Sequence, residues 1–311
     1  MQEIIFLEPV FQERIWGGAK LREVFNYDIP SQSTGECWAI SAHKNGDCKI
    51  KNGPLQGKTL SEAYNEYRYL FNNCPSPVFP LLSKILDAND DLSVQVHPDD
   101  AYALANVGEQ GKTECWYVLD CEEDTEMVFG HNAQTKAELI NCIENNEWDK
   151  LLRRVKIKKG DFFYVQAGTI HALCKGSLIL ETQQSSDTTY RVYDYNRCDQ
   201  QGKLRPLHIK EAIEVTTVPH VDYPLSITTK EETNSKITTF VREKYFTVEK
   251  WEINGVFNKR NDNFLLVSVI NGEGYINHEP IKKGDHFIIT SLLKDINISG
   301  NLELIVSFVT Q

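Results

Sequence analysis

Short apolar runs, many of them rich in β-branched and aromatic residues, dominate the second half of the chain. Runs of this kind, separated by glycine-bearing turns, are typical of strands. Because strand follows strand with no helix between, the pattern favours a β sandwich or jelly-roll barrel over alternating βαβ units. The expected strands are FFYVQA (162–167), LILETQQ (178–184), TYRVYDY (189–195), FLLVSVI (264–270), HFIIT (286–290) and LELIVSFV (302–309).

Helical signals are few and short. Thr59 with Glu62, and Thr135 with Glu138, form capping-box pairs ahead of apolar stripes. A third helix is expected over LHIKEAIEV, with Pro206 in its first turn, where proline lacks only an N–H that is unpaired anyway. The predicted fold is therefore mainly β, with short peripheral helices.

One phrase occurs twice in the chain. Residues 157–171 read IKKGDFFYVQAGTIH and residues 281–295 read IKKGDHFIITSLLKD. Only the first copy ends in a histidine, because Asp295 stands where the first copy has His171. The pattern predicts a duplicated β unit, with one chemically active copy and a second, degenerate copy kept for packing.

A polar, turn-rich segment separates the two copies at 219–238. We therefore expect two domains, a catalytic one over residues 1–228 and a C-terminal β domain without metal ligands over residues 239–311. The length of 311 residues allows each domain a core of its own.

Charge and cysteine usage exclude several classes of function. The net charge of −11, with no long run among the 33 basic residues, argues against nucleic-acid binding. No apolar run is long enough for a membrane span, and the N-terminus lacks a basic leader. The eight cysteines show no disulfide or CxxC spacing, so reduced thiols and a cytoplasmic location are expected.

Metal-ligand chemistry gathers in the first half of the chain. Gln95 and His97 lie two apart in SVQVHPDD, Glu114 follows in GKTECWYVLD, and His171 closes the first copy of the repeated phrase. Two imidazoles, a carboxylate and an amide oxygen suit Zn²⁺, and also Fe²⁺, Mn²⁺ or Co²⁺. The spacing from Gly160 to His171 resembles the second metal motif of the jelly-roll class called cupins.

Basic residues accompany these candidate ligands. Lys112 lies two residues before Glu114, and Arg191 and Arg197 follow the metal motif in a strand-rich stretch. Fixed cations beside a divalent metal indicate an oxygen-rich anionic substrate, and a guanidinium fork matches phosphate.

Four motifs in this order resemble the type I mannose-6-phosphate isomerases in their short bacterial form. They are QVHPDD, GKTECWYVLD, AGTIHAL and ETQQSSDTTYRVYDYNR, and RIWGG (14–18) and GECWAIS (35–41) also match. The similarity extends over nearly the whole chain. It implies a zinc-dependent cupin enzyme that interconverts mannose 6-phosphate and fructose 6-phosphate, with a small sugar phosphate as its partner.

The resemblance also implies residue roles. The metal ligands would be His97, Glu114, His171 and Gln95, with one Zn²⁺ per chain. Arg191 matches the family's catalytic arginine. Lys112, Glu181 and Asp187 fall on family positions that line the reaction site, and Ser93 and Arg197 fall where the substrate phosphate is expected to bind.

Aldose–ketose isomerisation moves a proton between C2 and C1 through an enediol. A divalent cation, Arg191 and Lys112 suit the developing charge on oxygen. The sequence leaves the general base open among a metal-bound water, Glu181 and Lys112, and it leaves the oligomeric state open. The alternatives are a cupin Fe(II) oxygenase, which would not need the cations, and a non-catalytic sugar-binding cupin.

Overall fold

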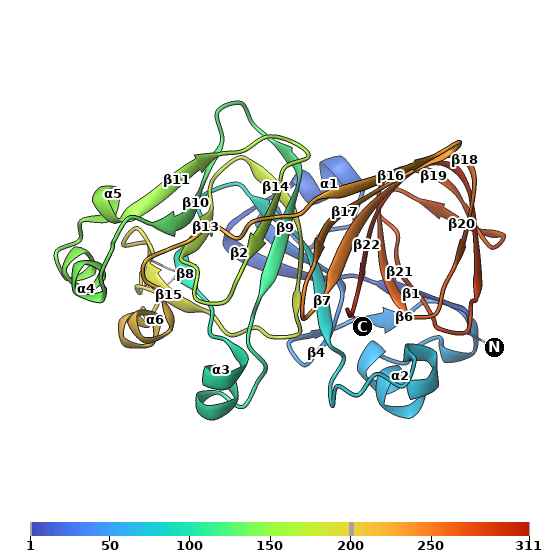
Figure 1. Cartoon of the computed structure of the whole chain (residues 1–311), viewed down its shortest axis with the longest axis horizontal. Helices are drawn as coiled ribbons and strands as arrows, with labels where there is room; N and C mark the ends of the chain where they lie inside the picture. Colours follow the sequence, from blue (N-terminus) through green and yellow to red (C-terminus); the bar gives the residue numbers. More distant parts are fainter. Residues whose placement is uncertain (1, 199–201, 311) are drawn as a thin grey trace.

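Strands make up most of the regular secondary structure and form two groups that lie side by side (Figure 1). The computed structural model describes residues 2–198 and 202–310. One group is built from the N-terminal two thirds of the chain, and the other from the C-terminal third together with the first strand. This arrangement confirms the prediction of a mainly-β chain with short helices at its periphery.

The N-terminal group consists of two antiparallel sheets that enclose an apolar interior. Leu86, Trp116 and Ile179 of one sheet pack against Met127 and Leu173 of the other. This is the two-sheet architecture of a jelly roll. The six-stranded sheet has the order β12 (Phe162–Val165), β9 (Glu114–Cys121), β14 (Ser177–Gln184), β7 (Leu81–Ala88), β3 (Thr34–Ile40) and β2 (Val10–Gly18). The five-stranded sheet has the order β11 (Leu152–Lys156), β10 (Glu126–His131), β13 (His171–Leu173), β8 (Val94–Val96) and β15 (Tyr190–Tyr193).

The C-terminal group is a nine-stranded sheet that includes the start of the chain. Ile5 of β1 pairs with Ile288 of β21, so the N-terminus lies among the C-terminal strands (Figure 1). The division into 1–228 and 239–311 remains a prediction, and the structure places residues 229–238 mainly in β16 and β17. The sheet has the order β16 (Thr228–Glu232), β17 (Ser235–Arg242), β18 (Thr247–Arg260), β22 (Asp295–Phe308), β19 (Leu265–Ile276), β21 (His286–Ile289), β1 (Ile4–Glu8) and β6 (Lys49–Ile50), with β20 (Glu279–Lys282) on β19. A separate hairpin joins β4 (Ala42–His43) to β5 (Gly46–Asp47).

The helices are short and lie outside the sheets. They are α1 (Lys20–Phe25), α2 (Leu60–Glu66), α3 (Asp100–Asn106), α4 (Lys136–Glu144), α5 (Trp148–Leu151) and α6 (Ile209–Val215), with 3₁₀ turns η1 (Gly53–Leu55) and η2 (Arg68–Phe71). The capping box at Thr59 is confirmed, and Thr135 accepts from the Glu138 N–H. Pro206 lies before α6 and not in its first turn, because His208 is the N-cap. Within residues 2–198 and 202–310, no helix is both long and apolar enough to span a membrane.

The repeated phrase folds the same way twice. The Lys158 N–H donates to the Asp161 carboxylate at 2.9 Å, and the Lys282 N–H donates to Asp285 at 2.8 Å. Both turns carry a glycine in the left-handed region, with φ of 91° and 92°, which explains why the glycine recurs. Each turn leads into a four-residue strand, β12 or β21, and the copies differ in the residue that begins the next strand. The first leads to His171 in β13, and the second leads to Asp295, which pairs with Arg260 at the surface.

The strand expected over residues 264–270 continues through a glycine-rich stretch where the sequence pattern favours a turn. Residues 271–274 lie within β19, where the register against β22 shifts between Val269 and Asn271. Gly272 is there because a Cβ would lie 1.8 Å from the Asn301 carbonyl oxygen. The glycines that resemble a turn in sequence therefore permit a bulge in a long strand.

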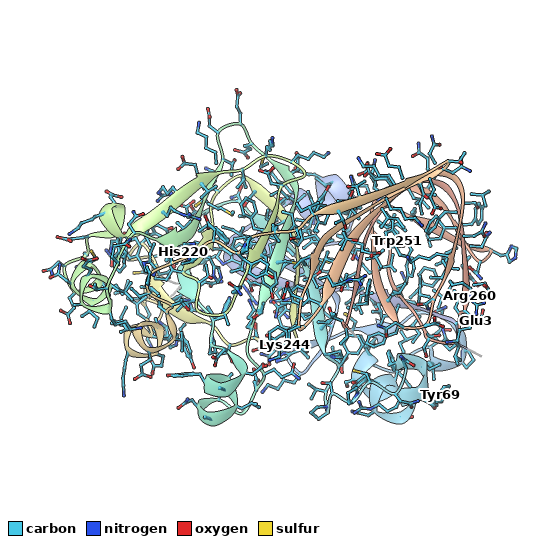
Figure 2. The ribbon with its side chains drawn as sticks, in the orientation of Figure 1. Glu3, Tyr69, His220, Lys244, Trp251 and Arg260 are labelled. Carbon is cyan, nitrogen blue, oxygen red and sulfur yellow. The ribbon has the colours of Figure 1, made fainter. Side chains whose placement is uncertain are left out.

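The two groups of strands share an apolar interface. The outer face of the six-stranded sheet contributes Tyr117 and Phe162, and Phe240 of β17 stacks on Phe162 with a centroid distance of 4.7 Å. A buried contact of 3.0 Å joins the hydroxyls of Thr182 and Ser307. Figure 2 shows Lys244 near α3, where its ammonium lies 3.7 Å from Asp100. The catalytic half therefore depends on the C-terminal sheet for burial of one face.

We expect Phe240→Ala to lower the free energy of unfolding by about 3–5 kcal/mol, because it removes a buried ring from this interface. Urea unfolding followed by fluorescence measures the change. Val256→Ala on β18, where Val256 is exposed, is the control and should change stability by less than about 0.5 kcal/mol. A loss below about 1 kcal/mol in Phe240→Ala would show that the interface contributes little.

Candidate metal centre and adjoining cavity

Three buried side chains converge between the two sheets of the N-terminal half. The ligand atoms of His97, Glu114 and His171 all lie within 4.8 Å of one another. The two Nε2 atoms are 3.2 Å apart, and each lies 3.3 to 3.4 Å from an oxygen of Glu114. Gln95 joins the group, since its Nε2 lies 3.4 Å from Nε2 of His171. All four proposed ligands are thus brought together.

Strand pairing explains this convergence. His171 begins β13 and is the Cα partner of Gln95 in β8, while His97 follows β8 directly. Glu114 begins β9 in the facing sheet, opposite Gln183 and Val165. Residues distant in sequence therefore meet because both sheets present the ends of their strands at one edge of the interior.

Both imidazoles are oriented by backbone carbonyls. Nδ1 of His97 lies 2.9 Å from the Thr188 carbonyl oxygen, and Nδ1 of His171 lies 2.9 Å from that of Thr169. Because a carbonyl only accepts, each Nδ1 carries the proton and donates it. Each neutral ring therefore directs the lone pair of Nε2 at the centre, as metal-binding histidines do.

Burial fixes the protonation state of the group. Burial, with help from the Lys112 ammonium, lowers the pKa of His97, and burial lowers that of His171 to about 3. Burial alone would raise the pKa of Glu114, but the positive charge of Lys112 is the largest of the effects that bring that pKa well below its usual value. Neutral imidazoles beside an ionised carboxylate are the state in which a divalent cation binds.

The group fits a divalent cation on its own geometry. Two Nε2 lone pairs and two carboxylate oxygens face one another, and Glu114 Oε1 is buried without a hydrogen-bond partner in the structure. Lys112 donates to Glu114 Oε2 and lies 3.0 Å from His97 Nε2. The Lys112 ammonium therefore reaches only Glu114 Oε2 and His97 Nε2. Glu114 Oε1 and His171 Nε2 need a second cation.

A cavity of about 500 Å³ adjoins the group. Of the residues predicted from sequence, its wall contains Ser93, Gln95, Lys112, Glu181, Asp187 and Arg191. Sequence reasoning missed other charged or polar members of the wall, namely Arg14, Glu36, Lys84, Arg205 and His208. Arg14 and Glu36 belong to motifs that were recognised, whereas Lys84 is signalled only by a lone charge in the buried strand LLSKILDA.

Arg197 is not part of this wall as the described residues form it. Its guanidinium donates to Asp194 Oδ1 at 2.6 Å and to the Asp91 carbonyl, and it lies 3.5 Å from Asp90. These contacts hold the side chain against the loop that precedes β8. The prediction that Arg197 binds substrate phosphate therefore finds no support in its position.

A row of side chains crosses the six-stranded sheet beneath the cavity. Trp38, Lys84, Glu181 and Trp116 are successive Cα partners on four strands. The Lys84 ammonium lies 4.5 Å from the Trp38 ring centroid and 3.9 Å from Glu181, and the Trp116 indole N–H donates to Glu181 at 3.0 Å. Burial, followed by the charge of Glu114, raises the pKa of Glu181.

Comparison with known proteins identifies the family. Residues 4–136 match the profile described as Phosphomannose isomerase type I, catalytic domain, and residues 236–309 match Mannose-6-phosphate isomerase, cupin domain. The sequence is 53% identical over 311 residues to Mannose-6-phosphate isomerase ManA of Bacillus subtilis, covering 98% of each chain. The chain belongs to the type I phosphomannose isomerase family. It is also 50% identical over 314 residues to Mannose-6-phosphate isomerase of Streptococcus mutans, covering 99% of this chain and 98% of that one.

The fold of this phosphomannose isomerase matches a solved structure throughout. The crystal structure of the Mannose 6-Phosphate Isomerase from Bacillus subtilis superimposes with a TM-score of 0.97 at 52% identity, covering 99% of this chain and 100% of that one. The predicted cupin fold and the resemblance on which it rested are confirmed.

We expect His171→Ala to weaken metal binding by roughly 100-fold or more, since it would remove one of the proposed ligands and not merely an outer partner. Elemental analysis after gel filtration measures metal per chain, and His278→Asn in an exposed left-handed turn is the matched control. Wild-type metal content in His171→Ala would contradict this assignment.

Proposed function

We propose that this enzyme interconverts mannose 6-phosphate and fructose 6-phosphate and that it holds one Zn²⁺ through His97, Glu114, His171 and Gln95. The observation that carries the proposal is a buried N,N,O donor group next to a cavity with several fixed cations. Its relatives in Bacillus subtilis and Streptococcus mutans carry the name of this activity. Free thiols at all eight cysteines are consistent with the cytoplasm as its location.

A cation held by His97, Glu114, His171 and Gln95 would supply Lewis-acid chemistry for polarising the substrate carbonyl. The protein's own cations stabilise the negative charge that develops on the enediol oxygen. The pKa of Lys112 is raised, because the Glu114 and Glu181 carboxylates outweigh the burial that would lower it. Lys112 is therefore an ammonium, which suits a hydrogen-bond donor to the enediol oxygen and not a base.

The side chain best suited to move the proton between C2 and C1 is Glu181. It is buried in the cavity wall, and its raised pKa makes it a stronger proton acceptor than a surface carboxylate. Lys84 faces it across the strand pair at 3.9 Å and stabilises its ionised form. Asp187, bound to Asn45 at 2.8 Å, and Ser93 complete the polar wall around the sugar.

Chelation tests the function and the metal together. A coupled assay should show turnover of mannose 6-phosphate. After chelation the turnover should fall to about 1% or less, because such a cation contributes several kcal/mol to catalysis. Zinc should restore the activity better than other divalent metals. Restoration only by Fe²⁺, accompanied by O₂ uptake, would favour the oxygenase. Undiminished turnover in metal-free protein would exclude the proposed chemistry.

Arg191→Ala should retain its metal but lose turnover by roughly 100- to 1,000-fold, because a fixed positive charge near the developing oxyanion is removed. Steady-state kinetics with parallel metal analysis measures both effects. Arg260→Ala, at an exposed ion pair with Asp295, is the control. Retention of a third of the wild-type kcat would discard the catalytic assignment of Arg191.

A further inference from the structure

The cavity wall reverses the charge balance of the rest of the protein. The chain has 33 basic and 44 acidic residues, yet the wall has five cations and three carboxylates. Three of those cations are guanidinium groups, those of Arg14, Arg191 and Arg205. A local surplus of two positive charges in an acidic protein indicates a dianionic ligand group.

Arg191 lacks an acidic partner. Among residues 2–198 and 202–310, no carboxylate lies within 4.0 Å of its guanidinium, and its Nε is buried without a hydrogen bond. Its Nη1 donates only to the Pro206 carbonyl, at 3.3 Å. Burial lowers the pKa of Arg191, and the neighbouring cations Arg205 and Arg14 lower it further, against the opposite effect of Asp194. Such a grouping is stabilised when an anion joins it.

Arg205 is fixed at this cluster by the backbone. The His208 N–H donates to the Arg191 carbonyl at 2.8 Å, and the Arg191 N–H donates to Nδ1 of His208 at 3.2 Å. These bonds hold the segment that carries Arg205 along β15, next to the cavity. Arg205 therefore owes its position to the two bonds between His208 and Arg191, whereas Arg197 is turned toward the loop around Asp91.

The contacts of Arg205 leave charge available. Its Nε and Nη2 donate to the two oxygens of Asp194, which also accepts from Arg197 at 2.6 Å. One carboxylate thus serves two guanidinium groups, and it remains paired if Arg205 is removed. Nη1 of Arg205 has no hydrogen bond within the described residues, and it is available to a ligand in the cavity.

We propose that Arg205 binds the phosphate group of the sugar phosphate, with Arg14 and Arg191 beside it. The proposal rests on the proposed function for the rest of the substrate. Arg191, Gln95 and His171 are successive partners across β15, β8 and β13, so Arg191 lies one strand spacing of about 4.8 Å from Gln95 and two such spacings from His171. A six-carbon sugar phosphate bridges that span from its reacting end to its phosphate.

The test compares phosphorylated and unphosphorylated substrate on the zinc-loaded enzyme. Arg205→Met should raise KM for mannose 6-phosphate roughly 10- to 100-fold, as expected for a lost charged hydrogen bond, with a smaller effect on kcat. The preference for mannose 6-phosphate over mannose, as a ratio of kcat/KM, should fall at least tenfold. If Arg205 had a purely structural role, the substitution would lower kcat/KM for mannose 6-phosphate and for mannose by the same factor. Arg205→Lys, which keeps the charge, should recover part of the loss.

Two further arginines sharpen the comparison. Arg153→Met removes an equivalent fork pair with Asp222 on another surface and should leave the preference unchanged. Arg197→Met tests the competing assignment, in which Arg197 binds the phosphate. A preference in Arg205→Met within threefold of wild type, or a larger loss in Arg197→Met, would overturn the proposal.

Binding of inorganic phosphate separates this proposal from the isomerase reaction. Phosphate should raise the Tm of the wild type and of Arg153→Met, but not that of Arg205→Met. If the wild type fails to isomerise mannose 6-phosphate, the proposed function falls, while the phosphate titration still decides the role of Arg205. Equal stabilisation of all three proteins would refute the site.

Discussion

Two imidazole lone pairs and a carboxylate, all directed into one dry space, form the constraint on which this structure depends. Backbone carbonyls hold the Nδ1 protons of His97 and His171, so neither ring can turn its N–H toward Glu114 without losing a bond. Burial opposes protonation of either ring. The repulsion among these acceptors is relieved by positive charge, part of it from Lys112 and the rest from a bound cation. The strands that converge here are thereby coupled to metal chemistry.

The buried charges of the cavity wall are stabilised because the sheets place groups of opposite charge near one another. Lys84 lies near three carboxylates, those of Glu36, Glu181 and Asp187, at 3.8 to 4.0 Å. Apolar side chains fill the rest of the same interior, as the position of Trp116 between the polar row and the core illustrates. A fixed network of this kind needs little rearrangement when charge develops on a substrate, which is how preorganised sites accelerate proton transfer. The same rigidity would make single charge deletions costly, because each leaves a buried partner unpaired.

Local sequence pattern predicted six of the strands from residue 162 onward, the capping box at Thr59 and the repeated turns, since each depends on neighbours in sequence. Motif spacing brought out His97, Glu114 and His171 for the same reason. The pattern did not predict that β1 pairs with β21 or that Lys84 lies opposite Glu181, because register between distant strands is set by tertiary packing. It also did not distinguish Arg197 from Arg205. Both lie in one irregular connection, and only the bonds between His208 and Arg191 determine which guanidinium reaches the cavity.

The pairing of β1 with β21 constrains the order in which the protein can fold during translation. Residues 4–8 are translated long before their partner at residues 286–289. Until then the nascent chain carries an unmatched apolar strand, and the outer face of the six-stranded sheet lacks the cover that Phe240 and its neighbours supply. A chain that stops before β17 would expose both surfaces together, and exposed apolar strands of this kind promote aggregation or chaperone binding.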